Sequence, residues 1–130
     1  MPRILVIDDD DLIRNLVHRA LTKAGYEVTV APNGRKGLAA FQAAPADLVV
    51  TDIIMPDMEG LEVIIEFKRR APGLKIVAMS GGGAAWNSDY LQMAEKLGAS
   101  RILHKPFSPS DLCALAGELL GGPAPTLQPT

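Results

Sequence analysis

Acidic, hydroxyl and basic side chains follow four separate apolar runs of the sequence. Asp8-Asp9, Asp52, Ser80 and Lys105 each stand just past a short run that predicts a β-strand. The runs are Arg3–Ile7, Asp47–Thr51, Lys75–Met79 and Arg101–His104. Because ligands gather at the carboxyl ends of the strands of a parallel sheet, these residues would converge on one small acidic pocket. Three carboxylates, a hydroxyl and an ammonium group suit a divalent cation and a phosphoryl group far better than a packed core.

The carboxylates of this pocket would repel one another, so that some of them would prefer to be protonated. A hard divalent cation removes that conflict, because it prefers oxygen ligands. Asp8 and Asp9 are neighbours, but both can reach the pocket because the chain turns at the end of the strand. Asp10 and Asp11 lie at the start of the next helix, where capping and the helix dipole favour a negative charge by about 0.3–1 kcal/mol. We therefore expect Asp10 and Asp11 to cap the helix rather than to bind metal.

The apolar pattern of the whole chain alternates between strand and helix five times. A further strand is predicted at Glu27–Ala31. Helical spacing follows each strand, over residues 13–24, 34–44, 60–70, 85–97 and 109–120. Five such units imply right-handed crossovers, with helices on both faces of a parallel sheet. The uncharged, proline-rich segment 121–130 predicts a flexible tail or the start of a linker, and an ordinary frayed terminus accounts for it at least as well.

The composition is that of an ordinary small globular protein. Its 130 residues suit one domain, with 48% hydrophobic and 22% charged residues. A net charge of −2 gives no footprint for nucleic acid or an anionic membrane, and no apolar run approaches the roughly 20 residues that cross a bilayer. A strand beginning at Arg3 leaves no room for a signal peptide, and a single cysteine cannot form an internal disulfide. We therefore expect a cytoplasmic protein that binds neither nucleic acid nor membranes.

The motifs at the strand ends resemble those of the receiver domain of two-component response regulators. They are Ile4-Leu5-Val6-Ile7-Asp8-Asp9-Asp10, Asp52-Ile53-Ile54-Met55-Pro56-Asp57-Met58-Glu59-Gly60, Ser80-Gly81 and Lys105-Pro106-Phe107. Their order and spacing match throughout, over about residues 2–120. The resemblance implies a flavodoxin-like, doubly wound α/β fold, with a five-stranded parallel sheet of order 2-1-3-4-5 and five flanking helices. We expect this receiver domain over residues 1–120.

The resemblance also implies a role for each residue of the pocket. Asp52 would be the phosphoacceptor, since an ionised carboxylate can attack phosphorus without a general base. Lys105 would neutralise one phosphoryl oxygen, and Ser80 would donate a hydrogen bond to another. In the family the peptide bond before the proline of this motif is cis, so we expect a cis Lys105–Pro106 bond.

The implied metal is Mg²⁺, with Mn²⁺ as the alternative ion. In the family the second acidic residue and the acceptor bind it directly, and these are Asp9 and Asp52 here. The first acidic residue, Asp8, would act largely through water. The backbone carbonyl two residues beyond the acceptor, that of Ile54, would complete the protein ligands.

The resemblance implies partners rather than substrates. A histidine kinase or histidine phosphotransfer protein would donate the phosphoryl group and dock near the first helix, with Leu12 and Leu16 as candidate contacts; core packing accounts equally well for Leu16. The output would be contact with a downstream protein. The chain would catalyse only its own phosphorylation and dephosphorylation, so we do not expect a conventional enzyme.

The chain departs from the family pattern at Ile102, where receivers usually carry Tyr or Phe. In the family that aromatic ring moves inward after phosphorylation. We expect Ile102 to be buried at all times, so that the signal of phosphorylation passes through the glycine-rich loop 81–86 instead. In the fourth helix, Trp86, Tyr90 and Met93 are candidate anchors for an output partner. For Tyr90 and Met93 we favour packing in the core.

Three rival functions remain for such a chain. A metal-dependent phosphohydrolase with an aspartyl intermediate commonly needs a second acid two residues after the nucleophile, where Ile54 cannot serve. A flavodoxin-like nucleotide binder needs a first loop that attracts phosphate, which the acidic segment 8–11 would repel. A pseudo-receiver would keep the fold without phosphorylation, but the retention of all five pocket residues argues against it.

Overall fold

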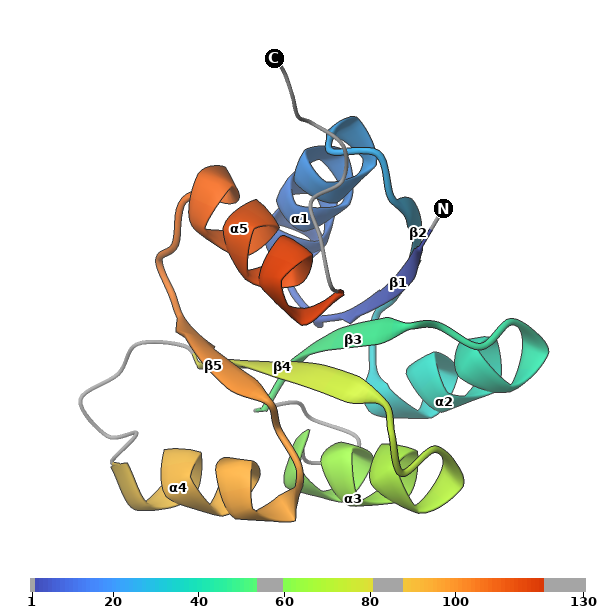
Figure 1. Ribbon diagram of the computed structural model, residues 1–130, viewed down its shortest axis with the longest axis vertical. Coiled ribbons are helices and arrows are strands. Elements are labelled where there is room, and N and C mark those ends of the chain that lie inside the picture. The colour runs from blue at the N-terminus through green and yellow to red at the C-terminus, as the bar shows by residue number, and fades with distance from the viewer. Residues whose placement is uncertain (1, 54–59, 81–87, 121–130) are drawn as a thin grey trace.

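The chain forms one sheet flanked by helices (Figure 1). The computed structural model describes residues 2–53, 60–80 and 88–120. In chain order the elements are β1 (Arg3–Ile7), α1 (Asp11–Lys23), β2 (Glu27–Ala31), α2 (Gly34–Ala43), β3 (Leu48–Asp52), α3 (Gly60–Arg70), β4 (Lys75–Ser80), α4 (Ser88–Leu97), β5 (Arg101–His104) and α5 (Pro109–Leu119). All pairings are parallel and the strand order is β2-β1-β3-β4-β5, which confirms the expected fold.

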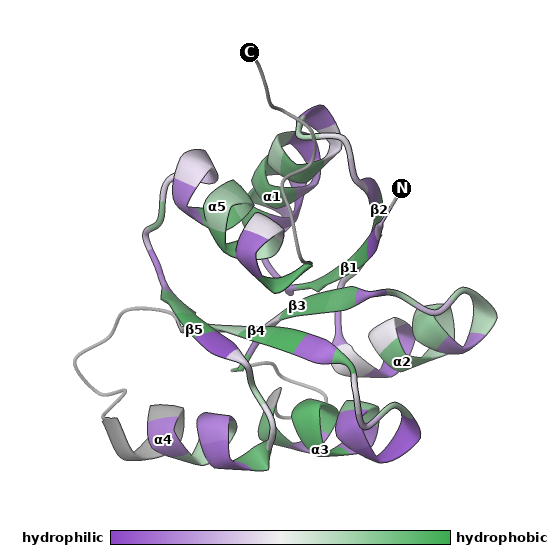
Figure 2. Cartoon of the chain, in the orientation of Figure 1, coloured by the Kyte–Doolittle hydropathy of each residue, from purple (hydrophilic) through white to green (hydrophobic). Residues whose placement is uncertain are grey.

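Two layers of helices cover the two faces of the sheet. Helices α1 and α5 lie on one face, and α2, α3 and α4 lie on the other (Figure 1). Side chains of β1 alternate between the two cores: Leu5 and Ile7 face α2 and α3, whereas Ile4 and Val6 face α1 and α5. Apolar residues accordingly run continuously along the central strands in Figure 2. A strand buried on both faces needs such a run, which is why the sequence of β1 is apolar without alternation.

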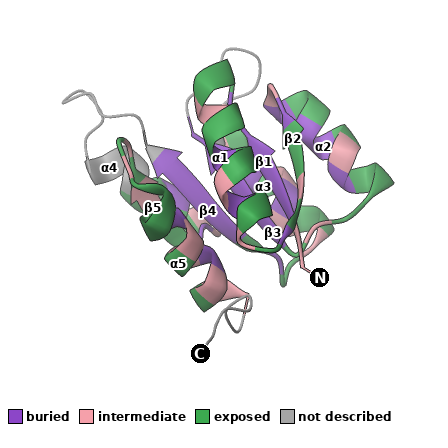
Figure 3. Cartoon of the chain, turned by 90° about the horizontal axis from the view of Figure 1, so that it is seen from above, coloured by how far each residue is buried: buried purple, intermediate pink, exposed green. Residues whose placement is uncertain are grey.

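Burial falls off from the middle of the sheet to its edges. The central strands β1, β3 and β4 are almost wholly buried, while the edge strands β2 and β5 are largely exposed (Figure 3). Ile102 of β5 is therefore only partly buried, packed against the core on the side of α3 and α4. The expectation that Ile102 is buried is therefore confirmed only in part. An edge strand has a neighbouring strand on one side only, which leaves part of its side chains exposed.

The carboxyl ends of the strands are brought level by the register of the sheet. Ile7 of β1 pairs with Thr51 of β3, and Asp52 pairs with Met79 of β4. The residues that follow these positions therefore emerge at one edge of the sheet. This is the edge at which the sequence placed its acidic and basic residues.

The first helix begins and ends as its sequence predicts. Asp10 is the N-cap, and its Oδ1 accepts hydrogen bonds from the backbone N–H groups of Leu12 (2.9 Å) and Ile13 (3.4 Å). Gly25 lies just beyond the other end with φ 104°, a left-handed conformation that glycine adopts without strain. The predicted capping role of Asp10 is confirmed, and Asp11 supplies the acidic residue of the first turn.

Several boundaries and one side chain differ from the prediction. Strands β3 and β4 each extend one residue further, since the backbones of Asp52 and Ser80 still pair although their side chains are polar. Helix α4 is described from Ser88, so the predicted start at 85–87, with Trp86, lies outside the described residues, as does the side chain of Tyr90. The prediction that Met93 packs in the core was wrong, because 47% of this residue is exposed.

The described helices do not cross a membrane. None of the helices within residues 2–53, 60–80 and 88–120 is both long and apolar enough to span a bilayer. The longest, α1, has 13 residues, whereas roughly 20 are needed.

Helix α2 approaches β1 closely because Gly37 has no side chain. A Cβ atom at this position would lie 2.4 Å from Cδ1 and 2.8 Å from Cγ1 of Ile7, which is fully buried. Ile7 directly precedes Asp8, so this contact lies next to the end of β1. Only glycine allows the helix to lie this close.

We predict that Gly37→Ala destabilises the protein by about 1–2 kcal/mol. Overpacking against Ile7 costs about 1–3 kcal/mol, and the better helix propensity of alanine returns up to about 1 kcal/mol. Urea unfolding monitored by circular dichroism measures the difference. Gly73→Ala is the matched control, because no atom lies within 4 Å of its added Cβ. Equal stability of the two variants would contradict the packing argument.

Candidate functional site

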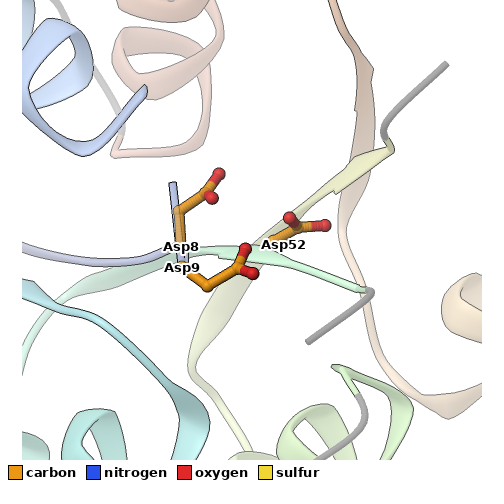
Figure 4. A group of neighbouring side chains, drawn as sticks. All are labelled: Asp8, Asp9 and Asp52. Atoms are coloured by element: carbon orange, nitrogen blue, oxygen red, sulfur yellow. The ribbon is translucent and has the colours of Figure 1, made fainter. Parts of the chain in front are cut away.

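Three carboxylates meet at the carboxyl edge of the sheet. Asp8 and Asp9 follow β1, and Asp52 is the last residue of β3. One carboxylate oxygen from each lies within 4.8 Å of the other two. Figure 4 shows the side chains of Asp8 and Asp9 beside that of Asp52. Asp8 and Asp52 are buried, whereas Asp9 is exposed. The cluster therefore has a buried floor and one wall open to solvent.

Every backbone and side-chain polar atom of Asp8 has a partner. Its N–H donates to the carbonyl of Ala31 (3.2 Å), and its own carbonyl accepts from Nη1 of Arg14 (2.9 Å). Its Oδ1 accepts from the backbone N–H of Asp10 (2.9 Å), and its Oδ2 accepts from Nζ of Lys105 (2.8 Å). These four hydrogen bonds hold Asp8 in one place. Its carboxylate is thus a fixed part of the pocket floor.

The Lys105 ammonium bridges the two buried carboxylates. Its Nζ lies 2.8 Å from Oδ2 of Asp8 and 3.2 Å from Oδ2 of Asp52, and its side chain is 16% exposed. Burial acts to lower the pKa of Lys105, but the hydrogen bond to Asp8 and the charges of Asp52 and Asp8 outweigh it, so the pKa is raised above 10.5. Lys105 is therefore charged at neutral pH. The Lys105–Pro106 peptide bond is cis, as expected.

Two predicted site residues are described only in part or not at all. Ser80 ends β4 and pairs with His104 in the sheet register, so its backbone lies at the same edge as the carboxylates. The side chain of Ser80 lies outside the described residues, and so does the whole of Ile54. The structure thus brings Asp8, Asp9, Asp52 and Lys105 together.

The donor set fits a hard divalent cation. Three carboxylates face one ammonium group, which leaves two formal negative charges in a small volume. Within the described part of the chain, the carboxylate of Asp9 accepts no hydrogen bond, so its oxygens remain available to a ligand. Oxygen donors of this kind are preferred by Mg²⁺ and Mn²⁺. Asp10 and Asp11 are not part of this cluster among the described residues.

Sequence reasoning missed Arg14. This residue lies near the N-terminal end of α1, where the helix dipole disfavours a positive charge. Its guanidinium reaches back to the Asp8 carbonyl and to the carboxylate of Asp11. In the sequence, a basic residue at the unfavourable end of a predicted helix was the one indication that another interaction holds Arg14 there.

Comparison with known proteins identifies relatives along most of the chain. A family model for the response regulator receiver domain matches residues 4–116. The response regulator receiver protein CpdR of Brucella abortus is 38% identical over 113 residues, which cover 86% of this chain and 91% of that protein. The DNA-binding transcriptional regulator NtrC of Rhizobium meliloti is 35% identical over 120 residues, or 92% of this chain.

The chain spans about a quarter of the length of the NtrC regulators that it matches, 24% in the Rhizobium meliloti protein. A crystal structure of a CheY-like response regulator receiver domain protein from Methanospirillum hungatei has a TM-score of 0.87 at 31% identity, covering 93% of this chain and 94% of that one. The family match, the stand-alone relative and the shared fold agree. The chain belongs to the response regulator receiver domain family, the signalling modules of two-component systems.

Proposed function

We propose that Asp52 is the phosphoacceptor of this receiver domain and that it takes a phosphoryl group from a phosphohistidine donor in the presence of Mg²⁺. The observation that carries this proposal is the position of Lys105, whose ammonium lies 3.2 Å from Asp52 within the acidic cluster. The Lys105 ammonium at this point would stabilise the negative charge that a phosphoryl group brings to Asp52.

The transfer requires little from the protein beyond placement and charge. A carboxylate oxygen of Asp52 attacks phosphorus, a new O–P bond forms, and the N–P bond to the donor imidazole breaks. The imidazole nitrogen keeps the electron pair and takes up a proton from solvent. Because the carboxylate is already a nucleophile when ionised, no histidine or other base of this chain is needed.

Charge neutralisation follows from the residues around Asp52. Lys105 would move its hydrogen bond from the carboxylate of Asp52 to a phosphoryl oxygen, while keeping its contact with Asp8. Ser80 would donate a hydrogen bond to a second oxygen. Mg²⁺, or Mn²⁺ in its place, would neutralise charge at the third oxygen when bound. Asp9 and Asp52 would hold the ion directly, with Asp8 acting through water and the Ile54 carbonyl as a further ligand.

The face of α1 supports docking of the donor next to this pocket. Leu12 is 78% exposed and Leu16 is 42% exposed, so core packing does not account for either. Beside them, a groove of about 500 Å³ is lined by Leu16, Arg19, Lys23 and Pro109 among others. Exposed apolar side chains next to basic ones fit a histidine kinase or a histidine phosphotransfer protein with a matching apolar and acidic surface.

Incubation with acetyl phosphate and Mg²⁺ should add one phosphoryl group to the protein, detected by intact mass. Asp52→Asn should add none, because the amide cannot act as the nucleophile. Asp111→Asn, a change at an exposed aspartate in α5, is the matched control and should be phosphorylated like the wild type. Phosphorylation of the Asp52→Asn protein would remove Asp52 from its proposed role.

Lys105→Met should destabilise the metal-free protein by about 3 kcal/mol, because it removes the positive charge that offsets the two buried carboxylates. Saturating Mg²⁺ should restore part of the lost stability.

The pKa of Lys105 is raised above 10.5. The ion pair therefore stabilises the fold below pH 10.5, and its contribution to stability is lost as the pH rises through the raised pKa. Urea unfolding in EDTA and in Mg²⁺ at several pH values measures this, with Lys75→Met at an exposed site as control. Equal losses for the two variants would be evidence against the bridge.

Ile54→Asn should shorten the lifetime of the phosphorylated protein. Ile54 is apolar at a position two residues after the acceptor, where a polar side chain can orient the hydrolysing water. The rate is measured by following the loss of the phosphoprotein after removal of acetyl phosphate. An unchanged decay rate in the variant would show that this side chain does not control hydrolysis.

A further inference from the structure

Arg14 binds the end of β1 from the side of α1. Its Nη1 donates a 2.9 Å hydrogen bond to the carbonyl of Asp8, and its Nη2 forms an ion pair with Asp11. The Arg14 side chain is 18% exposed, whereas that of Asp11 is 79% exposed. The guanidinium is therefore turned inward, toward the pocket, and the ion pair forms its outer contact.

This position is electrostatically unfavourable for the site as proposed. A guanidinium next to Asp8 repels a divalent cation, because like charges a few Å apart interact strongly where water is partly excluded. It also opposes the dipole of α1. If charge were its only contribution, Arg14 would weaken metal binding.

The geometry points to a different role, and this inference rests on the proposed metal site. We propose that Arg14 is a positioning residue, which holds the peptide between Asp8 and Asp9 and thereby places the Asp9 carboxylate. The side chain of Asp8 is already fixed by the Asp10 N–H and by Lys105. Among the described residues, nothing donates a hydrogen bond to the Asp9 carboxylate. Its location consequently depends on the backbone, which Arg14 holds at the Asp8 carbonyl.

The two contributions of Arg14 have opposite signs, which makes them separable. Arg14→Met keeps much of the length of the side chain but removes both its charge and its hydrogen bond. Positioning predicts Mg²⁺ binding about tenfold weaker, the usual effect of losing a residue that orients a metal ligand. Charge alone predicts tighter binding.

Isothermal titration of the full chain with Mg²⁺ gives the Kd, thermal unfolding in EDTA gives the stability, and the amide shift of Asp9 in a ¹⁵N spectrum reports the backbone. Weaker binding with a displaced Asp9 amide supports the proposal. Asp11→Asn is the matched control: it removes the outer ion pair and keeps the Asp8 hydrogen bond, so its Kd should stay within about twofold of the wild type.

Arg14→Lys keeps the test decisive if the methionine variant does not fold. It preserves the charge but replaces the planar guanidinium with a single ammonium group, which does not reproduce the geometry of the hydrogen bond to the Asp8 carbonyl, so a several-fold weaker Kd is expected. Binding as tight as or tighter than that of the wild type, in whichever of the two variants folds, overturns the positioning role. Absence of Mg²⁺ binding in the wild type is a separate result, since it contradicts the proposed function itself.

Discussion

The contact of one partly buried ammonium with two buried carboxylates is the constraint on which the rest of the site depends. Asp8 and Asp52 are removed from water at the ends of neighbouring strands, and Lys105 reaches both. Buried charges of one sign are tolerated only when they are paired. The lysine therefore allows two acids to be placed side by side in the core, and the exposed Asp9 then adds a negative charge that the lysine does not offset.

The end of β1 is held from three sides, which gives the pocket a rigid floor. From β2, Ala31 accepts a hydrogen bond from the Asp8 N–H, and from α2, Gly37 allows close packing on Ile7. From α1, Arg14 binds the Asp8 carbonyl. Rigid placement of this kind suits a reaction that is accelerated mainly by position and charge. Of the three clustered carboxylates, Asp9 is the exposed one, so an incoming ion would meet it first.

Much of this arrangement was predictable from the sequence, for reasons that differ from element to element. The apolar run of β1 and the capping residue Asp10 are local signals, and both were interpreted correctly. The strand order came from the resemblance to receivers, because periodicity does not determine which strands are neighbours.

Other features depend on contacts that a linear pattern does not contain. The bond from Arg14 to Asp8 forms across a turn, and the sequence showed only a basic residue in an unfavourable place. Met93 fitted a helical stripe, yet it lies at the exposed margin of α4. Asp52 was placed after its strand rather than within it, because a polar side chain ends the apolar run without ending the backbone pairing.

The most direct test of a single metal site at this edge of the sheet is a map of paramagnetic broadening by trace Mn²⁺ in ¹⁵N amide spectra. The account predicts that signals disappear first at residues 8–10, 51–53 and 105, which surround the three carboxylates, while those of Lys23 and Gly25 at the opposite end of α1 persist. Broadening centred on another acidic residue, such as Glu66, or spread evenly over the acidic surface would contradict it.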